Sequence, residues 1–417
     1  MKTKIFLTPI FVCLLVLNIQ AQDKRDNNTL VYSGKVVDAE TKKPVVFANV
    51  YLNGSGIGTV TNSEGEFIIR VPENYVASQL VITYLGYKNA IVSLKEFTNK
   101  EKTIFLEPSP IPIEEIIVRN KDPYELVKAA LKNIKQNYLD KPERQIGFYR
   151  EYIKQNRHYV EIAEAVLDIY KSSYTNELDY DRIKIFKGRK SYDVKKMDTV
   201  IFKFQGGPKT CFLLDVVKNP ANLLSQDMIN YYEYKLNGLT RINDRDVYII
   251  SFNQKERLPF ALYQGNLYLD VKTLAIIGID FKISEKALDL AVDDLVRKKP
   301  VGMKINLVSA NYLVNYLQSH NKWYLNHVKS ELVFNCKWDK KLFKSNYVIS
   351  FEMVVTDRDT MNVEKFKQRE TVSISDVLAD KVDYFADDNF WGDYNIIKPD
   401  ENIETAIKKL SRKLKFK

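Results

Sequence analysis

The stretch from Val31 to Leu106 constrains the fold more than any other part of the chain. It contains about seven short segments of alternating apolar residues, separated by turns rich in Asp, Asn, Gly, Pro and Ser. Alternation with a period of two points one face of each segment into a core, and turns at this spacing are typical of a β-sandwich. We therefore expect strands at residues 31–37, 46–52, 58–61, 66–70, 79–84, 88–94 and 102–106.

Four short motifs in this stretch resemble a known family. They are Gly34, Val36 and Asp38 at the start, Pro44, Ala48 and Val50, then Thr61, Ser63, Gly65 and Phe67, and finally Tyr84-Leu85-Gly86-Tyr87. With them, residues 31–107 resemble the carboxypeptidase-like regulatory domain. This transthyretin-like β-sandwich is common in envelope proteins of Bacteroidetes-type bacteria. The resemblance implies a fold and a compartment, and it implies no reaction.

The first 22 residues have the layout of a secretory signal peptide. Lys2 and Lys4 precede an apolar run from Ile5 to Leu17, which is too short to span a bilayer, and cleavage after Ala21 or Gln22 would follow. We expect export across the inner membrane, to the periplasm or to an outer-membrane-associated position. The formal net charge of +10 becomes +8 when the two leader lysines are removed. We interpret this basic balance as an ordinary solvated surface. Attraction to anionic lipid, polysaccharide or nucleic acid is the alternative, and nucleic acid is the least favoured of these because export separates the protein from it.

A Pro-rich linker, residues 108–120, marks the clearest boundary after the sandwich. Pro108, Pro110 and Pro112 favour an extended chain, and a short strand at 113–118 follows. A helix is expected next, because Asp122 can cap it and Pro123 suits its first position.

The region 121–385 reads as an α+β domain with a curved antiparallel sheet or half-barrel. Clean alternation predicts nine long strands, and apolar periodicity predicts two helices, at 212–229 and 285–297. The expected strands are 146–155, 158–171, 231–237, 245–253, 261–270, 274–284, 304–317, 322–338 and 345–356. Few crossovers and long strands favour helices that lie on one face of the sheet.

One hairpin within this region, Tyr263 to Gly278, resembles a hairpin of half-barrel periplasmic lipoprotein carriers. A strand ends at Asp270, a Lys-Thr turn follows, and an apolar strand returns. The resemblance covers about 50 residues with the strand before it. It implies an apolar concave face that holds acyl chains.

The last segment, residues 386–417, combines an aromatic loop with a basic amphipathic helix. Ile403, Ala406, Ile407, Leu410 and Leu414 recur at helical spacing among lysines and arginines. Such a helix makes peripheral contact with an anionic membrane, or it packs on its own domain. Packing on its own domain is the interpretation we favour.

The name of the carboxypeptidase-like regulatory domain suggests a zinc carboxypeptidase, and the chain contains one set of residues that could form a zinc site. His158 and Glu161 form an H-x-x-E pattern, and His320 or His327 would supply a third ligand. On a strand, however, residues i and i+3 point to opposite faces. No alternating β/α pattern of the zinc carboxypeptidase type follows. We therefore assign no catalytic, cofactor-binding or metal-binding residue, and no cofactor.

Two cysteines remain after the leader, Cys211 and Cys336. Export permits a disulfide, and two buried thiols are the alternative that we favour. The aromatic residues of the sheet, Tyr231, Tyr232, Tyr234, Phe252, Tyr263 and Tyr268, are interpreted as core rather than as a platform for sugars.

These observations predict a secreted cell-envelope protein without catalytic activity. The sandwich would be accessory, and the larger domain would bind an apolar or lipid-like ligand, or periplasmic or outer-membrane proteins. The alternative is a structural or adaptor component of an outer-membrane-associated complex. A zinc carboxypeptidase-like hydrolase is the second alternative.

Overall fold

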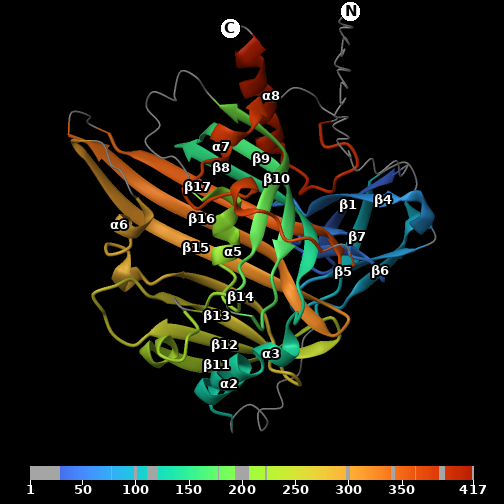
Figure 1. Ribbon diagram of the computed structural model, residues 1–417, viewed down its shortest axis with the longest axis horizontal. Helices are drawn as coiled ribbons and strands as arrows, with labels where there is room; N and C mark the ends of the chain where they lie inside the picture. The colour runs from blue at the N-terminus through green and yellow to red at the C-terminus, as the bar shows by residue number, and fades with distance from the viewer. Residues whose placement is uncertain are drawn as a thin grey trace, which may run out of the picture.

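The computed structural model describes residues 29–76, 78–97, 101–109, 121–176, 178–192, 206–220, 223–296, 301–339, 343–361, 363–384 and 390–415. The predicted signal peptide and most of the predicted Pro-rich linker with its short strand lie outside these residues. The described chain forms a small β-sandwich and a large open sheet (Figure 1).

Residues 29–106 form the predicted sandwich, and every expected strand is present. A sheet of order β4-β1-β7 faces a sheet of order β3-β2-β5-β6, and a fully apolar core fills the space between them. Their bounds are β1 Thr29–Asp38, β2 Asn49–Leu52, β3 Gly58–Val60, β4 Glu66–Pro72, β5 Gln79–Thr83, β6 Ala90–Ser93 and β7 Lys102–Leu106. The short 3-10 turns are η1 Glu73–Tyr75 and η2 Leu94–Glu96.

The large sheet has the order β11-β12-β13-β14-β15-β16-β17-β8-β9-β10-β18 and does not close into a barrel. Two antiparallel meanders, β8–β10 and β11–β17, join where β17 pairs with β8. The first has β8 Glu143–Gln155, β9 His158–Lys171 and β10 Arg182–Tyr192. The second has β11 Tyr232–Ile242, β12 Arg245–Gln254, β13 Tyr263–Asp270, β14 Ile276–Ile283, β15 Met303–Ser319, β16 Lys322–Trp338 and β17 Ser345–Asp359. All nine predicted strands are confirmed, and β10 and the parallel edge strand β18, Asp383–Tyr384, were not predicted.

The predicted helix at 212–229 is wrong. The chain forms the seven-residue α5, Gly207–Leu213, followed by turns and a 3-10 turn η4, Met228–Tyr231. Pro220 lacks an N–H and cannot continue a helix, and the Asp215 carboxylate is bound by side chains of the sheet. The apolar residues of this segment are still buried in the core, which explains the misleading pattern.

The predicted helix at 285–297 is also wrong as a continuous element. It is divided into η5, Glu285–Ala287, and the four-residue α6, Val292–Leu295. Ala287 and Ala291 nevertheless pack on the sheet. A helix of this length is stabilised mainly by packing, and here the apolar residues of the segment pack on the sheet from two short turns.

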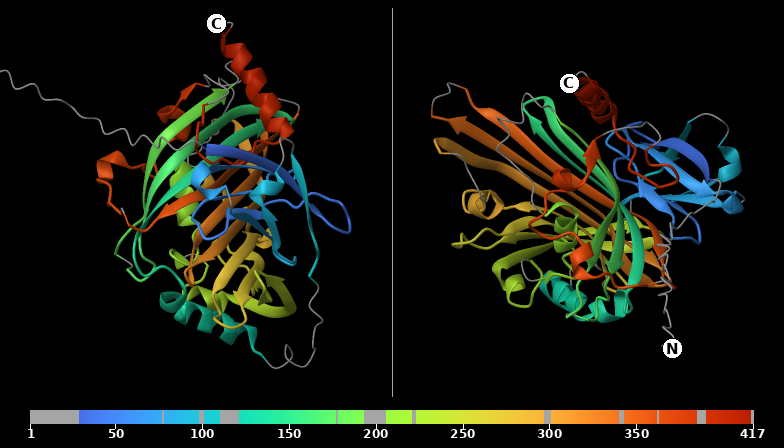
Figure 2. Two further views of the ribbon diagram at one scale, coloured as in Figure 1. Left: turned by 90° about the vertical axis from the view of Figure 1, so that its right-hand side faces the viewer. Right: turned by 45° about the horizontal axis from the view of Figure 1, so that its top comes forward.

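We call the two sides of the large sheet the inner and the outer face. Helix α2, Pro123–Lys132, α3, Ile134–Asn137, and α5 pack on the inner face in one large apolar core. Asp122 caps α2 as predicted, since its carboxylate accepts the backbone N–H of Tyr124 at 2.9 Å. The sandwich and helix α8, Glu401–Lys415, lie against the outer face (Figure 2). Two further short elements are η6 Gln368–Glu370 and α7 Leu378–Lys381.

Helix α8 packs on its own domain. Ile403, Ala406, Ile407 and Leu410 contact the sheet at Tyr152 and Ile162. The apolar side of α8 up to Leu410 is therefore occupied. Among the described residues, no helix combines the length and apolar character needed to cross a membrane.

Residues 390–400 form a strap between the sandwich and the outer face. The Thr59 hydroxyl donates to the Ile396 carbonyl at 2.9 Å, and the Asn395 side chain pairs with the backbone of Arg70 in both directions. Trp391, Ile396 and Ile397 fill an apolar layer against the sheet. The strap therefore joins two parts of the chain that are far apart in sequence.

A charge ladder crosses the outer face beneath this strap. It takes one residue from each of five neighbouring strands, in the order Lys329, Glu352, Arg150, Glu164, Arg189. Successive nitrogen–oxygen distances along it are 3.3, 3.2, 2.7 and 2.9 Å. The side chains of Arg150 and Glu164 are each 1% exposed. Arg150 also donates to the Ile397 carbonyl of the strap at 2.8 Å.

The ladder is stable because every buried charge has an opposite neighbour. Burial raises the pKa of Glu164, but the Arg150 and Arg189 guanidinium groups outweigh it and hold that pKa below its usual value. Burial likewise opposes the charge of Arg150, and the carboxylates of Glu164 and Glu352 restore it. Removing one member leaves its partners charged and desolvated, which is the costly case for a buried ion pair.

We expect the substitution Arg150→Met to lower the free energy of unfolding by about 3–5 kcal/mol, because Glu164 and Glu352 lose their shared cation. Arg241→Met is the matched control, since the side chains of the Arg241–Asp246 pair are 41% and 46% exposed and the pair should contribute less than about 1 kcal/mol. Urea unfolding of both variants measures the difference. Equal losses in the two variants would show that the ladder is not a stability centre.

Candidate functional site

The residues of the predicted zinc constellation do not converge. His158 is exposed at the start of β9, and His320 lies in the turn between β15 and β16. His158 lies in one row of paired residues with Gln155, Tyr347 and Phe334, and this row crosses β9, β8, β17 and β16. Phe334 is twelve residues along β16 from Lys322, which follows the turn that holds His320. At the usual rise of a strand this places His158 and His320 roughly 40 Å apart.

Glu161 and His327 lie on opposite faces of the sheet. Glu161 pairs with Ile153, whose side chain belongs to an apolar cluster of the inner face. His327 points to the outer face, where its ring contacts Phe47 of the sandwich. Among the residues that the structure describes, no group of three or more His, Cys, Asp and Glu side chains is placed to hold a metal ion. Cys211 and Cys336 are both free and buried, as expected.

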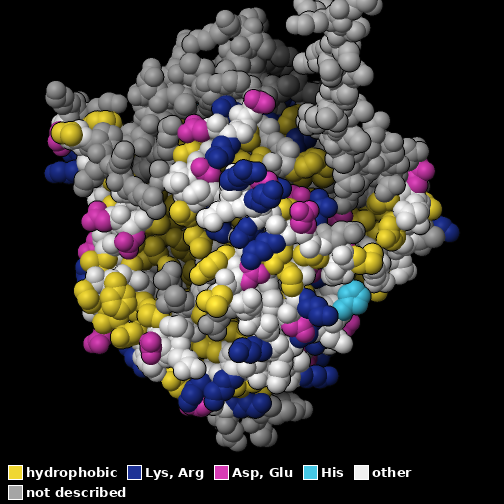
Figure 3. All heavy atoms as spheres, in the orientation of Figure 1, with side chains coloured by type: hydrophobic (Ala, Val, Ile, Leu, Met, Phe, Trp, Pro, Cys, Tyr) yellow, Lys and Arg dark blue, Asp and Glu magenta, His cyan; other side chains and the backbone are white. Residues whose placement is uncertain are grey.

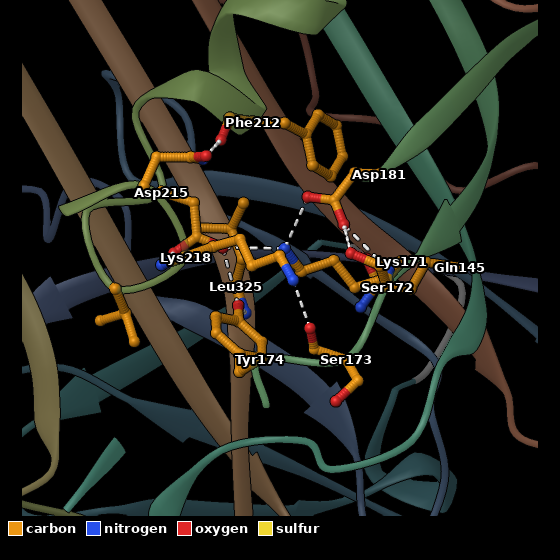
Figure 4. Close-up of polar contacts among 12 residues, drawn as sticks. Gln145, Lys171, Ser172, Ser173, Tyr174, Asp181, Phe212, Asp215, Lys218 and Leu325 are labelled. Carbon is orange, nitrogen blue, oxygen red and sulfur yellow. Dashed lines mark hydrogen bonds and ion pairs between the residues drawn. The ribbon is translucent and has the colours of Figure 1, made fainter. Parts of the chain in front are cut away.

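A buried polar cluster on the inner face was not predicted from the sequence. Lys171, at the end of β9, is fully buried, and its ammonium group lies 2.8 Å from Asp181 and 2.9 Å from Asp215 (Figure 4). The hydroxyls of Tyr174 and Tyr316 each donate to Asp215 at 2.8 Å. Lys171, Tyr174 and Asp181 lie within eleven residues of one another, but Asp215 and Tyr316 come from distant parts of the chain, so no local motif could reveal the cluster.

This cluster is built to hold charge rather than to transfer it. Burial by itself lowers the pKa of Lys171, but the two carboxylates outweigh burial and raise it above its usual value. Asp181 also accepts the backbone N–H and the hydroxyl of Ser172, both at 2.8 Å. A lysine held as an ammonium is neither a nucleophile nor a base. The cluster therefore fixes the segment 206–220 across the inner face.

The inner face continues beyond this fixed segment. Strands β15 and β16 have 17 residues each and β17 has 15, whereas β13 and β14 have eight. Figures 1 and 2 show the long strands projecting past α5. Their far ends carry a second apolar cluster, which we call the distal cluster: Ile153, Ile283, Ala287, Ala291, Met303, Ile305, Leu307, Ala310, Leu332, Phe334, Cys336, Tyr347 and Ile349.

Register explains why these side chains gather on one face. Ala310 pairs with Leu332, Leu332 with Ile349, and Ile349 with Ile153, so one apolar row crosses four strands. Directly paired residues of neighbouring strands point to the same side. The alternation that predicted these strands therefore also builds the distal cluster.

Large apolar side chains are exposed on segments that cover the inner face. Leu213 at the end of α5 is 47% exposed, Phe260 after β12 is 42% exposed, and Leu295 of α6 is 36% exposed. Figure 3 shows hydrophobic side chains gathered around a hollow on the left of this view, in the part of the molecule between α5 and α6.

The aromatic residues of the sheet are mainly core, as interpreted. Tyr232 and Phe252 belong to the large apolar core, and Tyr234, Tyr263 and Tyr268 pack against it. Tyr231 differs, since it is 40% exposed and contacts the ring of Phe260.

Comparison with known proteins gives a match for the first module. Residues 32–118 match the family model of the CarboxypepD_reg-like domain, which confirms the resemblance drawn from the sequence motifs. No curated protein matches the chain.

Two solved structures are similar to the chain over 58% of its length, and each is covered over 96% of its own length. One is a domain assigned to outer membrane lipoprotein sorting in Vibrio parahaemolyticus, with 12% identity and a TM-score of 0.26. The other is a DUF1329 family protein from Desulfovibrio piger, with 11% identity and a TM-score of 0.22.

His327 is the most unusual histidine of the chain. It is fully buried on the outer face, with its ring centroid 5.3 Å from that of Phe47, and neither ring nitrogen has a hydrogen-bond partner in the described part of the chain. Burial lowers its pKa to about 4, with the Glu352 charge opposing this shift and the Lys329 charge adding to it. The folded protein therefore holds this imidazole neutral.

We expect the free energy of unfolding to fall as the pH drops from about 6.5 to about 4. In this window the unfolded chain protonates His327 and the folded chain does not, which costs about 3 kcal/mol. His327→Phe should remove this part of the acid sensitivity, whereas His158→Phe, at an exposed position, should keep it. Urea unfolding at pH 7 and pH 4.5 distinguishes the two variants. The same acid loss in His327→Phe as in the natural chain would contradict the assignment.

Proposed function

We propose that this protein binds an apolar or lipid-like ligand on the inner face of its large sheet, at the distal cluster. In this proposal residues 121–385 form the binding domain, residues 31–107 form an accessory module, and binding rather than turnover is the activity. The predicted signal peptide supports a place in the periplasm or at the outer membrane.

The observation that carries the proposal is the distal cluster itself. An apolar row continues along β15, β16 and β17 past α5, and the segment 285–296, which packs on it, contains only short helical turns. A soluble domain of this size has enough chain to cover its apolar surface with longer helices. Large exposed apolar side chains that gather on one part of a surface mark an interaction site or a ligand-binding groove.

The chemistry of the cluster indicates which ligands fit. It contains no charged side chain, and its one hydroxyl, on Tyr347, accepts a hydrogen bond from Gln155 at 2.9 Å. Recognition would therefore come from buried apolar area, at about 25 cal/mol per Å². An alkyl or acyl chain matches this surface, and the hairpin resemblance to half-barrel carriers points to the same class.

We expect a twelve-carbon alkyl chain that carries an environment-sensitive fluorophore to bind with an increase in fluorescence. A double variant, Leu213→Asp with Phe260→Asp, should weaken binding about tenfold or more, because it places charge at an apolar rim. Phe105→Asp is the control, since Phe105 is 52% exposed on the sandwich, away from the inner face. Thermal melting confirms that the variants fold.

Two results of this titration would count against the proposal. One is a natural chain that gives no saturable binding. The other is a folded rim variant that binds as well as the Phe105→Asp control.

A further inference from the structure

The outer face of β11–β15 carries a polar trough that the proposed function does not use. It has a volume of about 610 Å³, and all its lining residues come from these five strands. Its polar lining consists of Glu233, Lys235, Ser251, Asn253, Gln264, Asn266, Asp280, Lys282 and Asn311. A volume in this range is typical of small-molecule sites.

Strand register places these polar side chains on one face. Ser251 pairs with Asn266, and Asn266 with Asp280; in the next row, Gln264 pairs with Lys282 and Lys282 with Asn311. The aromatic residues of the intervening rows belong to the inner core. The trough is therefore separate from the distal cluster and faces the other way.

The composition of the trough is unusual for a solvated sheet face. Asn is depleted in strands, because its side chain competes for backbone hydrogen bonds. Three of the amides, those of Asn253, Gln264 and Asn311, make no hydrogen bond within the described part of the chain. Each amide offers two donors and one acceptor to a bound molecule.

Charge in the trough is balanced. Glu233 and Asp280 face Lys235 and Lys282, so the formal charges of the lining cancel. The Asp280 carboxylate also accepts hydrogen bonds from the Tyr268 hydroxyl at 2.5 Å and from the Asn266 amide at 3.0 Å. A phosphate backbone or an anionic lipid needs an excess of cations, and the trough has none.

We propose that this trough binds a neutral glycan chain. A polyol presents alternating hydroxyl donors and acceptors without charge, which matches uncharged amides spread over neighbouring strands. The sandwich loop at Tyr84–Tyr87 docks on the same sheet, where the Gly86 N–H donates to the Arg241 carbonyl at 2.7 Å. The proposal is independent of the apolar site, because no residue of the distal cluster lines the trough.

The test is titration of the full chain with four neutral tetrasaccharides: cellotetraose, laminaritetraose, maltotetraose and tetra-N-acetylchitotetraose. We expect saturable binding of at least one by calorimetry, with shifts of side-chain amide signals in nitrogen–proton NMR spectra. Affinity should change less than twofold between about 50 and 500 mM NaCl, because the trough carries no net charge.

A double variant, Gln264→Ala with Asn311→Ala, should weaken this binding about tenfold. Asn306→Ala is the matched control, because Asn306 lies exposed on the same face of β15 and does not line the trough. Both variants should melt at the temperature of the natural chain, and both should still bind the alkyl probe.

Three results would overturn the proposal: no saturable binding of any tetrasaccharide, an equal loss of affinity in Asn306→Ala, or binding that disappears at high salt.

Discussion

The pairing of charges across five neighbouring strands is the interaction on which the arrangement of this molecule depends. An outer face with Arg150 and Glu164 at its centre can be covered only if each charge finds an opposite partner. The ladder supplies those partners, and Arg150 also donates to the Ile397 carbonyl of the strap. The cation–π contacts of Lys329 over Phe47 and Arg189 over Trp391 extend the ladder to the sandwich and to the strap.

Because the outer face is covered in this way, different elements pack on the two faces of the sheet. The sandwich, the strap and α8 occupy the outer face over β8–β10 and β16–β17, and α2 and α5 occupy the inner face, where α2 contacts β11 and α5 contacts β17. The cluster around Lys171 fixes the segment 206–220 on the inner side. Two surfaces remain: the apolar distal cluster inside and the polar trough outside.

Much of the fold follows from period-two alternation, which places the sandwich strands and nine strands of the large sheet. Strand β10 is different, because Arg and Lys alternate with Ile in it and the segment reads as a solvated stretch. Its Arg189 is buried by pairing with Glu164, a contact that the local sequence does not show. The helix expected at 212–229 fails for a similar reason, because Asp215 is bound by Lys171, Tyr174 and Tyr316 from distant elements.

The candidate site was predictable in character and not in detail. Alternating apolar residues and one hairpin indicated an apolar concave face, and register then assembled the distal cluster from five strands and the segment after β14. The H-x-x-E pattern at His158 and Glu161 did not predict a metal site. His327 lies on the other face of the sheet from Glu161, and His320 lies far from His158 in the turn between β15 and β16. The amide residues of the trough are present in the sequence, but they come together only because the strands from β11 to β15 pair in succession.

Methyl NMR of the perdeuterated protein, with labelled Ile, Leu and Val, tests the central claim most directly. On addition of a monomeric twelve-carbon detergent, the methyl signals of Ile305, Leu332 and Ile349 should shift and saturate. Those of Val166, Val354 and Ile397, buried beneath the sandwich and the strap, should stay unchanged. Shifts confined to the outer face, or no saturable shift at the distal cluster, would contradict a ligand site on the inner face.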